Sequence, residues 1–79
     1  MEMRRLKLHL PELVEQYEQD RGMDKLTQKE LADALGIPVS TLSRYMRGYL
    51  NRYDGEILEK LCDFFQCEIQ DLLRLERSA

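Results

Sequence analysis

The chain has 79 residues, of which 43% are hydrophobic and 34% are charged, and its formal net charge is −3 at pH 7. This length allows one domain with a single core and excludes a multidomain protein. No apolar run approaches the roughly 20 residues that span a bilayer, and Arg4, Arg5 and Lys7 interrupt the first residues, where a secretory signal would carry its apolar core. We therefore expect one domain over residues 1–79, outside the membrane and in the cytoplasm.

The N-terminal segment, residues 2–8 (EMRRLKL), shows no helical stripe and fits either an extended arm or a disordered basic tail. A helix over residues 11–20 should follow, because Pro11 suits a first helical turn and Gly22 comes directly after the pattern. The apolar stripe of this helix consists of Leu10, Leu13, Val14 and Tyr17. His9 is the only histidine, and we interpret it as an incidental residue at the end of the helix.

The second predicted helix, residues 28–35, has clear signals at both ends. Thr27 and Glu30 have the spacing of a capping box, in which the hydroxyl accepts from the Glu30 amide and the carboxylate reaches back to the cap. Gly36 suits the left-handed residue that ends many helices, because it lacks Cβ.

A third short helix, over residues 39–47, follows closely. Ala32, Gly36 and Leu42 have the spacing of a helix-turn-helix: a small residue where two helices cross, a glycine at the turn, and a branched apolar residue that packs back onto the first helix. The outward face of the second motif helix is short, polar and basic, as a helix that enters the major groove requires. The sequence thus predicts a helix-turn-helix over residues 27–48.

Two further helices are expected after the motif, over residues 55–65 and 69–75. Asp54 suits the N-cap of the first of them, and Gln66 with Cys67 interrupts the stripe between them. Tyr45, in the helix predicted over residues 39–47, is expected in the core. Tyr49 and Tyr53, in the loop that follows, either contact phosphates or cover the loop. The predicted core consists of Leu31, Leu35, Leu42, Leu58, Leu61 and Phe65.

The stretch TQKELADALGIPVSTLSRYMRG, residues 27–48, resembles the helix-turn-helix of the Cro/Xre, or lambda-repressor-like, DNA-binding domains. The segment LEKLCDFFQCEIQDLL, residues 58–73, is similar to the fourth and fifth helices of small members of that family. The resemblance implies an all-α, compact five-helix domain, with room for a short N-terminal strand or arm, that binds operator DNA as a homodimer. Arms in related families reach the DNA or add a strand at the dimer contact. Candidate apolar residues for that contact are Leu8, Leu72 and Leu75.

The resemblance also carries the DNA-contacting positions of the family onto this chain. The matching residues are Gln28, Val39, Ser40, Ser43, Arg44, Arg47 and Arg52. Gln28 corresponds to a phosphate contact at a helix N-terminus, Arg47 and Arg52 to phosphate contacts around the following loop, and the other four to the base-reading face, on which Arg44 would read guanine.

Two positions depart from the family pattern. Val39 is apolar where many relatives carry Gln or Arg, so it can contact only a thymine methyl group or exclude a base. Pro38 replaces the common Ser or Thr cap, which removes one backbone donor for a phosphate.

The net negative charge opposes DNA binding, but its distribution does not. No acidic residue lies between Asp33 and Asp54, whereas Arg44, Arg47 and Arg52 fall inside that gap. Because charges are screened over about 8 Å at physiological salt, a basic face on an acidic molecule can still bind DNA.

Nothing in the sequence argues for catalysis, and we expect no enzyme activity, cofactor or metal. The spacing of Cys62 and Cys67 is not a zinc pattern, and we interpret both as small core residues rather than a redox or metal site. The leading hypothesis is a sequence-specific transcriptional regulator. The alternative is an antitoxin-like or accessory protein that acts mainly through a protein partner, an interpretation that the acidic balance supports.

Overall fold

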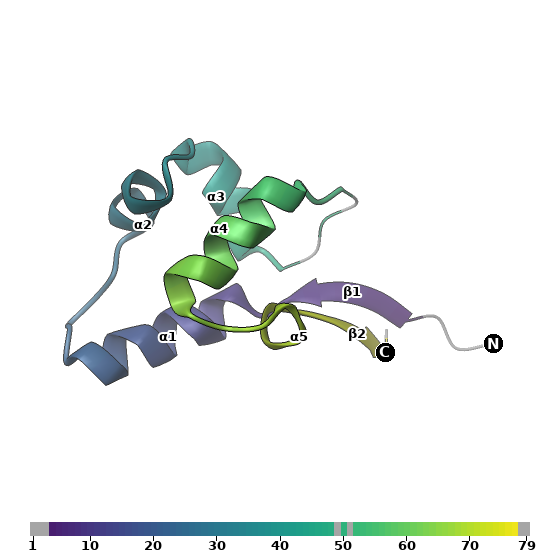
Figure 1. The fold of residues 1–79 in the computed structure, drawn as a ribbon, viewed down its shortest axis with the longest axis horizontal. Coiled ribbons are helices and arrows are strands. Elements are labelled where there is room, and N and C mark those ends of the chain that lie inside the picture. The colour runs from purple at the N-terminus through teal and green to yellow at the C-terminus, as the bar shows by residue number, and fades with distance from the viewer. Residues whose placement is uncertain (1–3, 49, 51, 78–79) are drawn as a thin grey trace.

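The computed structural model describes residues 4–48, 50 and 52–77, and in that part of the chain five helices are framed by two strands. In chain order the elements are β1 (Arg4–Leu8), α1 (Leu10–Arg21), α2 (Gln28–Leu35), α3 (Val39–Met46), α4 (Gly55–Phe65), α5 (Ile69–Leu72) and β2 (Leu73–Arg77). Figure 1 shows the four longer helices gathered into one body, from which β1 and β2 extend together as a ribbon. Within the described residues, no helix combines the length and the apolar character needed to cross a membrane.

The helix-turn-helix forms as its local signals predict. The Glu30 amide donates to Thr27 Oγ1 over 3.1 Å, and the Thr27 amide donates to Glu30 Oε1 over 3.3 Å, which completes the capping box. Gly36 ends α2 with a φ of +71°, a conformation that costs glycine little. The predicted bounds of α2 are confirmed, and α3 ends one residue earlier than expected, with Arg47 at its C-cap.

The helix predicted over residues 55–65 is also confirmed, as α4. Asp54 caps it, since its Oδ1 accepts from the Glu56 amide over 2.9 Å. At its other end Gln66 adopts a left-handed φ of +55°, and the Cys67 amide donates to the Cys62 carbonyl over 3.0 Å. This is a Schellman ending made without glycine.

The prediction of a last helix over residues 69–75 is wrong in its second half, and so is the purely all-α class. α5 stops at Leu72, and the next five residues form β2, which pairs antiparallel with β1. The register joins Arg4 with Arg77, Arg5 with Glu76, Leu6 with Leu75, Lys7 with Arg74, and Leu8 with Leu73. The fold is mostly helical with a two-stranded sheet. The N-terminal strand, one of the alternatives for residues 2–8, exists and pairs with the C-terminal segment of its own chain.

The junction of β1 and α1 holds the ribbon against the helices. The Leu8 amide donates to the Gly48 carbonyl over 2.8 Å, and the His9 amide donates to the Leu72 carbonyl over 2.7 Å. Gly48 has a φ of +87°, and a Cβ there would lie 3.3 Å from the Leu8 carbonyl oxygen, so the close approach needs glycine. His9 is therefore not incidental: its backbone anchors α5, and its ring contacts the Glu76 carboxylate of β2.

The core is larger than the sequence predicts. Its fully packed residues are Leu8, Leu10, Val14, Leu31, Ala32, Leu35, Leu42, Tyr45, Leu61 and Leu72. Leu58 and Phe65, two of the six expected core residues, are only partly buried. Phe65 belongs instead to a cluster of aromatic rings with Tyr17 and Phe64, whose centroids lie 5.0–5.7 Å apart.

The burial also corrects the candidate dimer residues. Leu8 and Leu72 have no exposed surface, because both pack inside the monomer, and neither can contact a second chain directly. Leu75 differs from them, since 52% of it is exposed.

Replacing Leu42 by alanine should lower the free energy of unfolding by about 2–4 kcal/mol, because Leu42 is fully buried and the change leaves a cavity beneath α3. A denaturant titration monitored by circular dichroism measures this cost. Val39→Ala also shortens an apolar side chain, but Val39 is 42% exposed, so this change should cost well under 1 kcal/mol. Equal losses for the two variants would contradict the assignment of Leu42 to the core.

Candidate nucleic-acid interface

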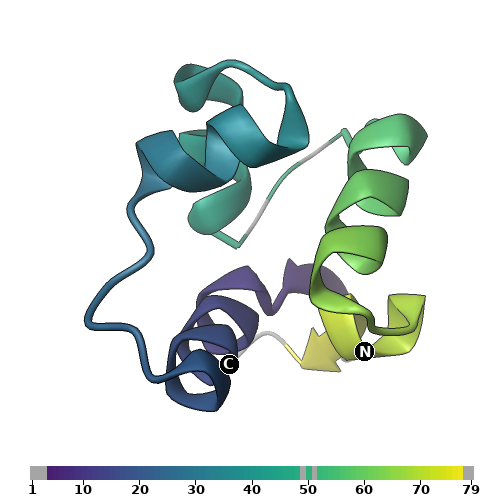
Figure 2. The same ribbon diagram turned by 60° about the vertical axis from the view of Figure 1, so that its left-hand side comes forward.

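The outward face of α3 is built by the helix periodicity. Leu42 and Tyr45 are buried, whereas Ser40, Arg44 and Arg47 are exposed. Because the buried residues fix the helix on one side, the exposed residues project from the other as one face. Val39, at the start of the helix, is 42% exposed. Figure 2 shows α2 and α3 side by side at the upper left, away from α4 at the right.

One edge of this face joins α3 to the start of α2. Ser43 Oγ donates to Gln28 Oε1 over 2.7 Å, which brings together two of the predicted DNA-contacting residues. A glutamine amide group also carries two N–H donors, so Gln28 can accept from Ser43 and donate to a phosphate at the same time. The contact spans fifteen residues of sequence, and no local pattern could have indicated it.

The other edge joins α3 to the start of α4. Arg44 and Arg52 line one surface groove, together with Tyr53 and the capping residue Asp54. Two predicted site residues from different segments thus lie at the same place. Arg47 stands at the end of α3, exposed, with its amide bonded to the Arg44 carbonyl over 3.2 Å.

Two tyrosines line this groove: Tyr45 belongs to the buried core, and Tyr53 is partly buried and packs against it. Tyr45 is 4% exposed, as predicted, and its hydroxyl oxygen accepts from the Asp54 amide over 2.8 Å, which fixes the approach to α4. Tyr53 packs edge-on against Tyr45, with ring centroids 6.3 Å apart. The Tyr53 hydroxyl is buried and has no hydrogen-bond partner in the described part of the chain. Tyr49 lies outside the described residues.

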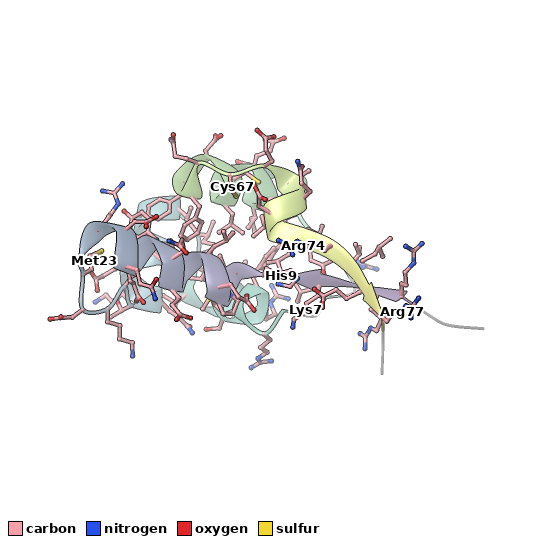
Figure 3. All side chains as sticks on the ribbon, turned by 90° about the horizontal axis from the view of Figure 1, so that it is seen from below. Lys7, His9, Met23, Cys67, Arg74 and Arg77 are labelled. Carbon is pink, nitrogen blue, oxygen red and sulfur yellow. The ribbon has the colours of Figure 1, made fainter. Side chains whose placement is uncertain are left out.

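A second basic surface, which the sequence analysis missed, runs along the two strands. We call residues 4–8 and 73–77 the basic ribbon, because they carry five basic side chains and one acidic one, on a chain whose net charge is −3. Figure 3 shows Lys7, Arg74 and Arg77 along these strands. The charges come from opposite ends of the sequence, and only the strand pairing reveals the cluster.

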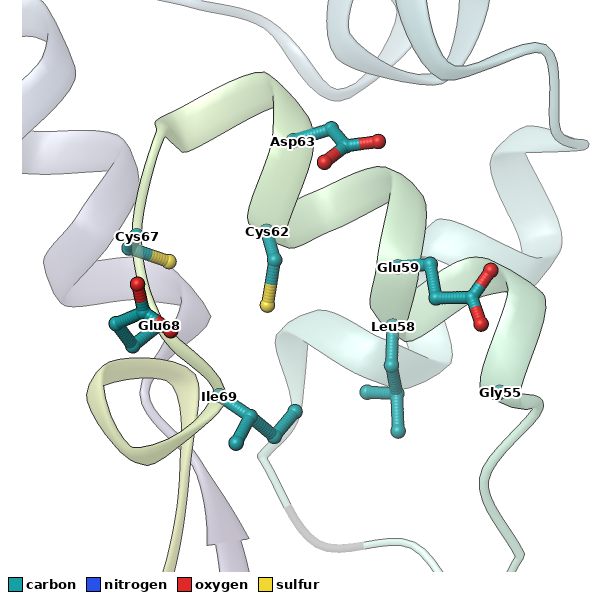
Figure 4. Close-up of a pocket in the computed structure, with 8 residues that line it drawn as sticks. All are labelled: Gly55, Leu58, Glu59, Cys62, Asp63, Cys67, Glu68 and Ile69. Carbon is teal, nitrogen blue, oxygen red and sulfur yellow. The ribbon is translucent and has the colours of Figure 1, made fainter.

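An acidic groove lies between α4 and α5, on another part of the molecule. Its apolar floor includes Leu58 and Ile69, and its acidic residues are Glu59, Asp63 and Glu68 (Figure 4). We call it the α4–α5 groove. Leu58 is half-buried here, whereas Ile69 is 48% exposed.

Cys62 and Cys67 also line the α4–α5 groove, and both are partly buried and pack against the core, so they lie at its margin rather than inside it as expected. Figure 4 shows both sulfur atoms directed into the same space. Burial raises the pKa of both thiols, and the pKa of Cys67 reaches about 11. No group of three or more metal-ligating side chains occurs among residues that the structure describes.

The raised pKa makes Cys67 a slow nucleophile. At pH 8 its thiolate fraction should be about 100-fold below that of a thiol with the ordinary pKa of 9.0. Because a thiolate of higher pKa is intrinsically more nucleophilic, its reaction with iodoacetamide should be slower by about tenfold. The rate is measured in the wild-type protein by mass spectrometry of the peptide that carries Cys67, because Cys62 contributes to the shift, and the urea-unfolded protein is the control.

The same shift has a consequence for stability. The folded state holds the Cys67 proton more tightly than the unfolded state. The protonated thiol therefore contributes fully to the free energy of unfolding below pH 9, and this contribution is lost as the pH rises toward 11. Equal alkylation rates in the folded and unfolded protein at pH 8 would contradict the burial of this thiol.

A comparison with protein families gives independent evidence for a helix-turn-helix DNA-binding domain. The model of the Cro/C1-type HTH DNA-binding domain matches residues 16–78, a segment that includes α2, α3, α4, α5 and β2. No curated protein and no solved structure matches the chain significantly.

Proposed function

Because the chain belongs to the Cro/C1-type helix-turn-helix DNA-binding domain family, we propose that it is a sequence-specific transcriptional regulator. In this proposal the whole chain, residues 1–79, is one domain that binds double-stranded operator DNA and needs no cofactor, metal or catalytic activity. The observation that carries it is the outward face of α3, where Ser40, Arg44 and Arg47 are exposed on a helix fixed by the buried Leu42.

Base reading is assigned to the middle and start of α3. Arg44 can donate two hydrogen bonds to the O6 and N7 atoms of guanine, a pair of acceptors that only guanine presents in the major groove. The Ser40 hydroxyl can donate to or accept from a neighbouring base, whereas Ser43, which donates to Gln28, can accept from one. Val39 contacts a thymine methyl group, and its exposure suits that role.

Phosphate contacts are assigned to the edges of the same face. Gln28 stands at the N-terminus of α2, where backbone amides and the helix dipole favour an anion. Arg47 and Arg52 lie at and beyond the end of α3, where the DNA backbone passes. The pairing of Gln28 with Ser43 supports a common docking of α2 and α3.

The regulator should act as a homodimer. One recognition helix reads only a few base pairs, and a two-fold dimer doubles the site by placing two copies of α3 about 34 Å apart, one turn of the duplex. The competing function, an antitoxin-like or accessory protein with a protein partner, is favoured by one observation, the acidic α4–α5 groove with its apolar floor.

The exchange of Arg44 for alanine should separate base reading from phosphate contact. Arg44→Ala should weaken binding to the preferred site by about 1–3 kcal/mol and relax the choice of one base pair. Arg52→Ala should instead weaken binding to all sequences alike and reduce the salt slope by about one unit. The preferred site comes from selection among random DNA sequences, and affinities follow by fluorescence anisotropy at several salt concentrations.

Each outcome of this pair of variants is informative. Equal weakening of preferred and scrambled DNA by Arg44→Ala would make Arg44 a phosphate contact. If both variants kept the affinity and the specificity of the wild-type protein, the regulator proposal would fail in favour of the protein-partner function. Arg21→Ala, a change on α1 outside the proposed interface, serves as the matched control.

The number of chains on the operator tests the dimer. Sedimentation velocity of the protein with a saturated operator fragment should give two chains per duplex, because the proposed site has two half-sites. A complex with a single chain at saturation would remove the dimer from the proposal and leave DNA binding intact.

A further inference from the structure

The two strands expose a pair of leucines that continue the core outward. Leu6 and Leu75 lie opposite each other in the register and are 40% and 52% exposed. Alternate residues of a strand point to the same side, and Leu8, two residues from Leu6, is fully buried in the core. Leu6 and Leu75 therefore lie on the same side of the ribbon as Leu8, and close to the helices this side is covered by the core.

Most of the exposed large apolar side chains lie near this end of the fold. In the described residues they are Leu6, Val39, Ile69 and Leu75. Val39 has a role in the proposed DNA interface, but the other three lie on the basic ribbon and at the edge of the α4–α5 groove. A two-stranded ribbon is only marginally stable alone, so a cover over its apolar side would stabilise it.

The charges of the two surfaces are complementary. The basic ribbon carries five basic side chains and one acidic side chain, whereas Glu59, Asp63 and Glu68 line the α4–α5 groove without a basic neighbour among its lining residues. A ribbon cannot dock against an identical ribbon through its charges, because like charges repel. Two ribbons can pack through their leucines, provided that the basic tip of each meets an acidic surface, such as the α4–α5 groove of the other copy.

We propose that the basic ribbon and the α4–α5 groove form the dimer interface of this protein, with a second copy of the chain as the occupant. The Leu6–Leu75 pairs of the two copies pack against each other at the two-fold axis. The tip of each ribbon, which carries Arg4, then lies against the acidic edge of the groove at the partner's Glu59. Each contact occurs twice, as in any two-fold interface. This inference deepens the proposed function by giving its homodimer an interface.

The edges of the strands support contact through the face of the ribbon. β1 and β2 form a sheet of two strands in the described chain, so each has an edge without a strand neighbour. Lysine and arginine side chains along an edge disfavour pairing with a further strand. Nucleic acid would match the basic charges of the ribbon but would leave Leu6 and Leu75 exposed, and for this reason the second copy is the better occupant.

Sedimentation equilibrium without DNA tests the leucine contact. The wild-type chain should dimerise, and Leu75→Glu should weaken association by at least about tenfold, because it places a charge at the two-fold axis. Val39→Glu is the matched control, since Val39 has similar exposure on another face and its change should leave the dimer intact. Circular dichroism establishes that each variant is folded.

A charge exchange tests the second contact and keeps the proposal falsifiable if Leu75→Glu unfolds. Arg4→Glu and Glu59→Arg should each weaken the dimer by about fivefold or more, and the double variant should recover most of the loss, because the opposite charges face each other again. Both residues are exposed, so these changes leave the core untouched.

Three results would overturn the inference: a monomeric wild-type chain at 100 μM, about a hundred times a micromolar dissociation constant; equal effects of Leu75→Glu and Val39→Glu; or no recovery in the double variant. If Arg4→Glu lowers DNA affinity and leaves association unchanged, the ribbon binds nucleic acid instead. Since association is measured without DNA, a monomer that still selects an operator would refute this interface and leave DNA binding by α3 in place.

Discussion

Two successive backbone amides, those of Leu8 and His9, connect the N-terminal segment to the end of α3 and to the end of α5. The first donates to Gly48 at the end of α3 and the second to Leu72 at the end of α5, while the Leu8 side chain fills the core between them. Helices of eight residues are not stable alone in water, so α2 and α3 depend on such contacts for their orientation. The outward face of α3 is therefore held in part by β1, a strand that does not belong to the motif.

The parts of the fold that the sequence predicts well are those decided by neighbouring residues. The capping box at Thr27, the left-handed glycine at Gly36 and the cap at Asp54 are satisfied within a few residues of where they occur, so their patterns were sufficient to place α2 and α4. β2 depends on a partner at the other end of the chain. The alternation of Leu73 and Leu75 with charged residues fits a strand as well as a helix end, and only the pairing with β1 decides between them.

The candidate site shows the same division between local and distant effects. Helix periodicity was enough to place Arg44 outward and Tyr45 inward, because both follow from the apolar stripe of α3. The bond between Ser43 and Gln28, and the shared groove of Arg44 and Arg52, require the turn between helices and the loop after them to be folded. The sequence does not show whether an apolar residue near a chain end is buried by its own domain or by a partner chain. For this reason it wrongly indicates Leu8 and Leu72 as intermolecular contacts.

The pairing of β1 with β2 also determines when this fold can be completed during synthesis on the ribosome. β1 is the first described element to be made and β2 the last, so β1 must wait, unpaired, while every helix is translated. Closing contacts between distant segments is slow because the intervening chain must first be ordered. A chain without β2 would leave β1 with no strand partner and would leave Leu8 without Leu73 beside it.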